Sequence, residues 1–241
     1  MLEQPVGEAG QTGTQAAVWR LTQSIARLDI RTDGLRVRLS EARGRIVAQA
    51  NARAAGTPIR AQAAAATAAQ AADDLADRLC HRIRQAAGCW TARAWPDTDD
   101  ASVPSRVPPP ERAVGPGLLA RLKLVPLTRC TPEAAVAVMD LMDYPAHLFV
   151  DTDTGLDAVV YRAGPTGYRL ARVLPVPPPV PNTVPLTVDP RPAPPLDPEQ
   201  AMGRLDETGL GHLFFTDRET GRGQLIYRRF DLRYALLKDL R

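Results

Sequence analysis

Residues 131–173, TPEAAVAVMDLMDYPAHLFVDTDTGLDAVVYRAGPTGYRLARV, decide the fold of this chain because they occur twice. A shift of 66 residues aligns residues 197–239 (copy 2) with them (copy 1) without a gap, and 12 of the 43 positions are identical. Since most identical residues are turn formers and aromatics rather than abundant alanine, we interpret the repeat as an internal duplication. The identical pairs are Pro132/Pro198, Glu133/Glu199, Ala135/Ala201, Asp140/Asp206, Phe149/Phe215, Asp151/Asp217, Thr154/Thr220, Gly155/Gly221, Tyr161/Tyr227, Arg162/Arg228, Tyr168/Tyr234 and Leu170/Leu236.

Each copy predicts the same order of elements. A capping residue, a proline and an acid open a helix at residues 131–133 and again at 197–199. The next strand runs into Asp-x-x-Thr-Gly, whose glycine (Gly155 or Gly221) supplies the positive φ of a tight hairpin. Two further strands follow, and a strand ahead of the helix completes a βαβββ unit. The predicted strands are residues 125–128, 147–150, 158–161 and 168–170 in copy 1, and 184–187, 213–215, 224–227 and 234–236 in copy 2.

The N-terminal part predicts a helix, three strands and a second helix. Apolar residues recur at helical spacing from Thr14 to Leu28, whereas residues 1–13 are polar and contain no reliable strand. Alternation in Leu35-Arg36-Val37-Arg38-Leu39 places the leucines and valine toward a core and the arginines on the other face. The remaining predicted elements are strands at 46–53 and 58–63 and a helix at 68–87 capped by Thr67.

Basic residues gather in this part of the chain. Residues 1–87 hold 12 arginines and 8 acids, whereas basic and acidic residues balance from residue 121 onward. The outer face of the three strands is predicted to carry arginines and no acid, and further arginines lie on the second helix. Such a surface suits nucleic-acid phosphates, although an ordinary solvated face would have the same composition. The candidate RNA-binding residues are Arg36, Arg38, Arg53, Arg60, Arg78, Arg82 and Arg84.

Proline-rich segments divide the chain. Residues 88–120 have a linker's composition, and the segment 175–198 holds 11 prolines in 24 residues, which predicts extended polyproline-like chain. We therefore expect an α+β protein with an N-terminal (β)αβββα domain and two small tandem βαβββ domains joined by Pro-rich linkers. The predicted boundaries are 1–87, 88–120 (linker), 121–173, 174–195 (linker) and 196–241.

No constellation of an enzyme is found. His81, His147 and His212 lie in different segments, and His147 aligns with Leu213, so we interpret the histidines as structural. The three cysteines have no metal-site or redox spacing. Asp151 and Asp217 precede a Thr-Gly hairpin and are interpreted as turn residues. We predict no catalytic residue, no metal, no cofactor, no membrane insertion and a cytoplasmic location.

The residues of the repeat carry a family resemblance. Thr-Pro-Glu-x-Ala, then His-Leu-Phe-x-Asp-x-Asp-Thr-Gly, Val-Val-Tyr-Arg and Gly-Tyr-Arg-Leu resemble the C-terminal domain of the long ribosome hibernation promoting factors. A tandem pair resembles the actinobacterial type. The order of elements in residues 14–87 resembles the ribosome-binding domain of the same family without its first strand. The resemblance implies binding to the small ribosomal subunit (16S rRNA and ribosomal proteins) at the mRNA and tRNA decoding region, and inhibition of translation.

The family also implies that C-terminal domains associate. We predict that copy 1 and copy 2 pair within one chain, in preference to a homodimer, through the repeated aromatics Phe149, Tyr161, Phe215 and Tyr227, although these could equally be core residues. The alternative interpretation is a protein-interaction scaffold that acts through the tandem C-terminal domains and binds no RNA.

Overall fold

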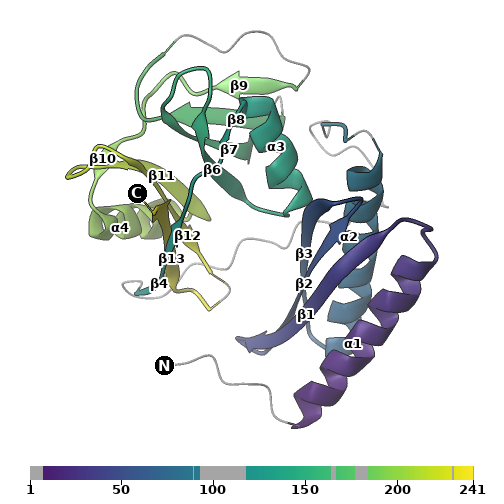
Figure 1. Cartoon of the computed structure of the whole chain (residues 1–241). Coiled ribbons are helices and arrows are strands. Elements are labelled where there is room, and N and C mark those ends of the chain that lie inside the picture. Colours follow the sequence, from purple (N-terminus) through teal and green to yellow (C-terminus); the bar gives the residue numbers. More distant parts are fainter. Residues whose placement is uncertain are drawn as a thin grey trace. The chain divides into compact units, whose positions relative to one another are not determined.

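The computed structural model describes residues 8–88, 90–92, 118–163, 167–176, 184–229 and 231–240. Its helices and strands confirm the predicted mixed α+β class (Figure 1). By their contacts the residues form two compact units. Unit 1 holds the N-terminal elements together with residues 141–143, and unit 2 holds the rest of both copies of the repeat. Most of the first predicted linker, residues 93–117, and residues 177–183 of the second lie outside the described residues.

Unit 1 has the predicted order of helix, three strands and helix. Its strands form an antiparallel sheet in the order β1-β2-β3, and both helices cover the same face (Figure 1). Each hairpin turns through two residues with positive φ, Arg43 and Gly44 and then Ala55 and Gly56, as type I′ turns require. The elements are α1 (Glu8–Ala26), β1 (Thr32–Ala42), β2 (Arg45–Ala54), β3 (Thr57–Ala65) and α2 (Ala68–Ala87).

The core of unit 1 is built from small residues. The core faces of β2 and β3 are largely alanine, which allows the leucines and isoleucine of α2 to pack close to the sheet. The predicted cap is confirmed, since the Thr67 side chain accepts a hydrogen bond from the Gln70 N–H. α1 begins at Glu8, six residues before the predicted Thr14. A strand ahead of α1 stays a prediction, because residues 1–7 lie outside the described residues.

Unit 2 confirms the duplication and the βαβββ order of each copy. Every element of copy 2 begins within one residue of the position that a 66-residue shift predicts. Gly155 and Gly221 have φ of 72° and 67°, as their hairpins require. Copy 1 comprises β5 (Arg129–Cys130), α3 (Pro132–Leu141), β6 (Ala146–Asp151), β7 (Asp157–Ala163) and β8 (Gly167–Arg172). Copy 2 comprises β10 (Pro195–Leu196), α4 (Pro198–Thr208), β11 (His212–Asp217), β12 (Gly223–Arg228) and β13 (Tyr234–Asp239).

The strands ahead of the helices differ from the prediction. β5 and β10 take that place in each copy, rather than residues 125–128 and 184–187. β4 (Leu119–Val125) precedes copy 1 but pairs in parallel with β13 of copy 2. Likewise β9 (Leu186–Val188) precedes copy 2 but pairs in parallel with β8 of copy 1. Each five-stranded sheet is therefore completed by a strand that leads into the other copy, and part of the predicted polyproline-like segment is a β-strand.

Three of the repeated residues form the same hydrogen-bond network in both copies, buried in copy 1 and partly buried in copy 2. In copy 1 the Tyr168 hydroxyl donates to Asp140, and Arg162 donates to that hydroxyl at 3.1 Å. In copy 2 the Tyr234 hydroxyl donates to Asp206, and Arg228 donates to it at 2.9 Å. Because the aspartate belongs to the helix and the other two residues belong to the sheet, the network fixes each helix on its sheet. Their identity in both copies therefore has a structural cause.

Candidate nucleic-acid interface

The outer face of the unit 1 sheet brings four candidate arginines together. Strand register places residues directly opposite one another in two rows across β1, β2 and β3. One row is Arg36, Asn51 and Arg60, and the next is Arg38, Gln49 and Gln62. Residues opposite each other in a sheet project on the same side, here away from α1 and α2. We call this surface, with Arg53 at its end, the outer sheet face.

The arginines of the outer sheet face differ in exposure and in their hydrogen bonds. Arg36 and Arg38 are exposed on the edge strand β1. Arg60 is half-buried and donates to the side-chain oxygens of Gln49 at 3.2 Å and Gln62 at 2.9 Å. Arg53 donates to the carbonyl of Gly56 at 3.2 Å. The two glutamines hold the Arg60 guanidinium in place, so the face offers one half-buried and several exposed positive charges to a polyanion.

One acid interrupts the predicted acid-free face. A register shift in β1 between Asp33 and Arg36 brings Asp33 directly opposite Arg53. The alternation of Leu35 to Leu39 does not extend through this irregularity, so it could not reveal the position of Asp33. The basic character of the face is consequently concentrated at Arg36, Arg38 and Arg60.

The three candidate arginines of α2 lie elsewhere. Arg78 and Arg82 are only 7% and 6% exposed. Arg78 donates to the backbone carbonyl of Gln62 at the edge of β3, and Arg82 donates to Gln85 at 3.1 Å. Arg84 is exposed in the last turn of α2, which packs on the opposite side of the sheet. The structure therefore does not bring these three residues onto the outer sheet face.

Two further arginines were missed by the sequence interpretation. Arg43 and Arg45 are exposed at the β1–β2 hairpin, and Arg45 donates to the carbonyl of Ala64 at 2.6 Å. The Arg-Gly pair of Arg43 and Gly44 between two alternating strands was the signal that could have located them. They extend the positive charge beyond the end of the rows.

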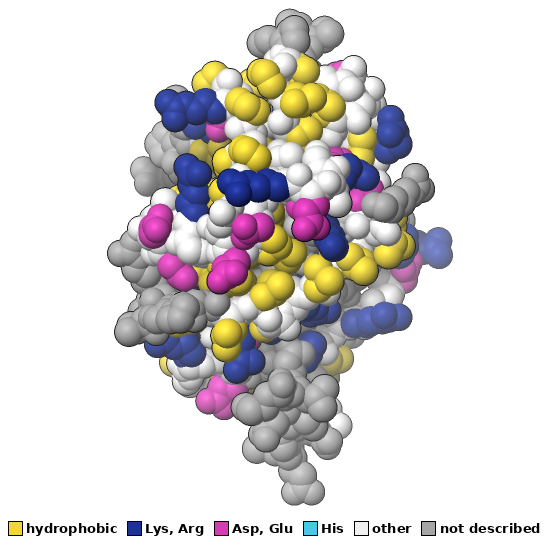
Figure 2. Space-filling view, turned by 90° about the vertical axis from the view of Figure 1, so that its left-hand side faces the viewer, with side chains coloured by type: hydrophobic (Ala, Val, Ile, Leu, Met, Phe, Trp, Pro, Cys, Tyr) yellow, Lys and Arg dark blue, Asp and Glu magenta, His cyan; other side chains and the backbone are white. Residues whose placement is uncertain are grey.

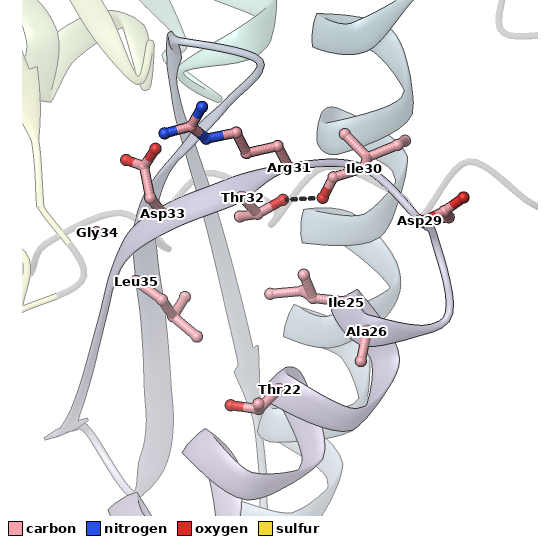
Figure 3. Close-up of a pocket in the computed structure, with 10 residues that line it drawn as sticks. All are labelled: Thr22, Ile25, Ala26, Asp29, Ile30, Arg31, Thr32, Asp33, Gly34 and Leu35. Carbon is pink, nitrogen blue, oxygen red and sulfur yellow. Dashed lines mark hydrogen bonds between the residues drawn. The ribbon is translucent and has the colours of Figure 1, made fainter.

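A shallow pocket lies where α1 passes into β1 (Figure 3). The side chains of Ile25 and Leu35 face the space between the helix and the strand, and both pack against the unit 1 core. Thr32 donates its hydroxyl to the Ile30 carbonyl at 3.1 Å, so this polar group serves the turn itself. The lining includes no histidine or cysteine, and we assign it to packing.

The predicted turn roles of Asp151 and Asp217 are seen in the structure. Their carboxylates accept the N–H groups of Asp153 at 3.0 Å and Glu219 at 3.1 Å, respectively.

Two buried groups outside the outer sheet face have shifted pKa values. Burial raises the pKa of the Cys130 thiol to about 11 and lowers the pKa of the His147 imidazole to about 4. Among the described residues there is no cluster of three or more potential metal ligands. No described helix is long and apolar enough to cross a bilayer.

The four aromatics predicted for domain pairing fall on two different faces. Phe149 and Phe215 are fully buried, and Phe215 packs with residues of α4 in a helix-covered core, as the alternative interpretation of core residues expects. Tyr161 instead contacts His212 of copy 2 edge-to-face, with ring centroids 5.4 Å apart. Tyr227 lies beneath the Lys123 ammonium, at 5.1 Å.

The contact between the copies is made by the residues just before Phe149 and Phe215, together with the residues opposite them on the next strand. Leu148 and Val159 of copy 1 share one buried cluster with Phe214 and Leu225 of copy 2, and we call it the inter-copy cluster. On the surface drawn in Figure 2, by contrast, basic and acidic side chains are interspersed.

Known proteins resemble the chain over most of its length. Residues 116–170 match the family model for the sigma 54 modulation/S30EA ribosomal protein C terminus. The chain is also 45% identical over 220 residues to the dormancy associated translation inhibitor of Mycobacterium tuberculosis, in strains CDC 1551 / Oshkosh and ATCC 25618 / H37Rv. Each alignment covers 86% of this chain and 76% of the relative, so it extends well beyond the repeat into unit 1.

Proposed function

Because the chain belongs to the sigma 54 modulation/S30EA ribosomal protein family of long ribosome hibernation factors, we propose that it inhibits translation by binding the small ribosomal subunit. The resemblance implies a site at the decoding region, where the protein would exclude mRNA and tRNA. The name of the M. tuberculosis relatives, dormancy associated translation inhibitor, supports this activity. The protein would act by occupancy in the cytoplasm, without a cofactor.

The outer sheet face is the observation that carries this proposal. Its two rows present Arg36, Arg38 and Arg60 beside amide side chains that can also donate to phosphate oxygens. Trp19 is the only aromatic among residues 1–87, and it lies on α1 rather than on the sheet. Base stacking is therefore a minor contribution, and the face would recognise the shape and charge of a folded RNA.

We further propose that the two copies of the repeat replace a dimer of two molecules. Three features support it: β4 and β9 each complete the sheet of the other copy, the inter-copy cluster is buried, and a tether keeps the copies at high effective concentration. A factor whose two copies pair within one chain would inhibit a single ribosome rather than join two ribosomes. Sucrose-gradient profiles of purified ribosomes with the full chain test both parts. Co-migration with small subunits and single ribosomes is expected, whereas a dimer peak would contradict intramolecular closure.

A scaffold remains the second candidate, because β4 exposes apolar residues. Leu119, Leu122 and Leu124 are 40%, 51% and 48% exposed on this edge strand, and such a surface suits a partner protein. Residues 1–90 include all of the secondary structure and almost all of the core of unit 1, and they distinguish the two functions. Added to a cell-free translation extract, they inhibit synthesis under the first proposal and have no effect under the second.

A further inference from the structure

One polar contact between the copies joins positions that are equivalent in the repeat. Asp157 is the first residue of β7, and the residue 66 positions later is Gly223, the first residue of β12. The backbone N–H of Gly223 donates to Asp157 Oδ2 at 2.8 Å. Since equivalent positions meet, this contact lies near the axis that would relate the two copies. The residues at that axis nevertheless differ, an acid on one side and no side chain on the other.

Arg222 completes the contact from the side of copy 2. Its guanidinium donates to Asp157 through Nε at 2.7 Å and through Nη2 at 3.2 Å. The same Nη2 donates to Asp239 at 2.6 Å, so one arginine holds a carboxylate from each copy. Asp157 is 5% exposed, and a bidentate pair of this kind is both strong and directional. The hydrogen bond to Asp157 raises the pKa of Arg222 further above its ordinary value.

The two copies also differ in side-chain size at this contact. A Cβ at position 223 would lie 2.8 Å from the Asp157 Cβ and 2.8 Å from the Phe214 ring, which leaves no room for a side chain. Phe214 stands where copy 1 has the smaller Leu148. Copy 2 thus combines a large residue with a glycine, and copy 1 combines a smaller residue with an aspartate. The two surfaces are complementary rather than identical.

We propose that the two copies recognise each other as unlike partners, so that a copy-1 surface accepts copy 2 and rejects another copy 1. In a pair of two copy-1 surfaces, a second Asp157 side chain would take the place of Gly223, where the structure leaves no room even for a Cβ. No guanidinium would neutralise the two carboxylates, because Leu156 occupies the position of Arg222. In a pair of two copy-2 surfaces, Arg222 would lose the carboxylate of Asp157. Two buried carboxylates without a guanidinium disfavour the first pair, and the loss of the bidentate contact, which leaves Arg222 with Asp239 alone, disfavours the second.

This inference rests on the intramolecular pairing proposed above and adds what selects the partner. A tether alone raises the effective concentration of every pairing within its reach, but it does not favour one surface chemistry over another. The contact of Asp157 with Arg222 and Gly223 supplies that choice. It would keep two chains from associating through like copies even at high protein concentration, which a factor that acts singly requires.

Exchange of the contact residues between the copies tests the proposal in the full chain. The first variant gives copy 2 the residues of copy 1: Phe214→Leu, Arg222→Leu and Gly223→Asp. The second adds the reverse changes in copy 1: Leu148→Phe, Leu156→Arg and Asp157→Gly. The first variant should lower the unfolding midpoint of unit 2 by roughly 5–10 °C, and the second should recover at least half of that loss although it carries twice as many substitutions.

The controls separate failure of this inference from failure of the proposed function. Far-UV circular dichroism verifies that each variant is folded, and Asp153→Asn removes an exposed acid near Asp157 without touching the contact. An unchanged midpoint in the first variant, or no recovery in the second, overturns unlike-partner recognition. If the first variant does not fold, non-additive midpoint losses in Asp157→Asn, Arg222→Leu and their double variant decide instead, and additive losses count against it. None of these measurements involves ribosomes, so the gradient result stands or fails independently.

Discussion

The hydroxyl of Tyr234 donates a hydrogen bond to the carboxylate of Asp206 and thereby joins β13 to α4. Burial, followed by this hydrogen bond, raises the pKa of Tyr234. The same bond joins Tyr168 to Asp140 in copy 1, so the duplication has retained a buried polar link that a hydrophobic pair could have replaced. The link specifies one orientation of each helix on its sheet, because only that orientation pairs the carboxylate.

Removal of either hydroxyl should destabilise unit 2. Tyr234→Phe and Tyr168→Phe each leave an aspartate without one of its partners, and we expect a loss of about 1–3 kcal/mol in the free energy of unfolding. Urea unfolding followed by circular dichroism measures it. Tyr227→Phe is the matched control, since Tyr227 is only partly buried, and its change should stay below about 0.5 kcal/mol. Equal losses in all three variants would contradict the role of the aspartates.

Substitution by alanine should change the stability of unit 2 in opposite directions at two glycines. Gly223→Ala should lower the stability of unit 2 by roughly 1–3 kcal/mol, because its Cβ would lie 2.8 Å from both Asp157 and Phe214. Gly203→Ala should raise it by about 0.5–1 kcal/mol, because Gly203 lies inside α4 with open space around it. Thermal unfolding of the two variants beside the wild type gives the comparison. Destabilisation by Gly203→Ala would refute it.

His147 should make unit 2 sensitive to acid. Burial lowers its pKa from 6.5 to about 4, so between these values the unfolded chain binds a proton that the folded chain does not. Stability therefore falls as pH falls from about 6.5 to 4, by on the order of 2 kcal/mol. His147→Leu places the residue of copy 2, Leu213, at this position and should flatten the dependence in this window. Urea midpoints at a series of pH values measure it, and identical slopes for both chains would exclude His147 as the cause.

The edge arginines should govern RNA affinity. Arg36→Glu with Arg38→Glu should weaken binding to small subunits by more than tenfold at moderate salt. The dependence of log affinity on log salt should become shallower by about 2, one unit for each phosphate that the protein no longer neutralises. The matched control is Arg191→Glu with Arg204→Glu, which makes the same change in net charge at exposed positions of unit 2. Co-sedimentation over a salt series tests the prediction, and equal effects of the two pairs would show that net charge alone determines affinity.

Local sequence patterns predicted the helices and strands of this fold better than they predicted which strands pair. The repeat, its hairpin glycines and the order of elements follow from short-range signals such as proline at the start of a helix and glycine with positive φ. The pairing of β4 and β9 with the sheet of the other copy does not follow from such signals. The sheet edge to which a strand adds depends on residues more than 10 positions away along the chain. No local propensity contains that information.

The misassigned residues have equally physical explanations. Leu148, Phe149 and Val150 are all apolar, so nothing in their pattern distinguishes the helix-covered face from the inter-copy face. Arg78 and Arg82 were predicted as RNA contacts on the second helix of the N-terminal part. Both side chains are buried instead, and Arg78 reaches the Gln62 carbonyl at the edge of β3, which a helical periodicity does not report.

The exchange of strands also constrains the order in which the molecule can mature. β4 is synthesised before copy 1, yet its partner β13, the last strand of copy 2, emerges more than 100 residues later. Until then the β4 leucines have no sheet to join, and nascent or truncated chains would carry an adhesive edge that chaperones and proteases recognise. The paired arrangement of the two copies would thus form only after the last strand of copy 2 has been synthesised.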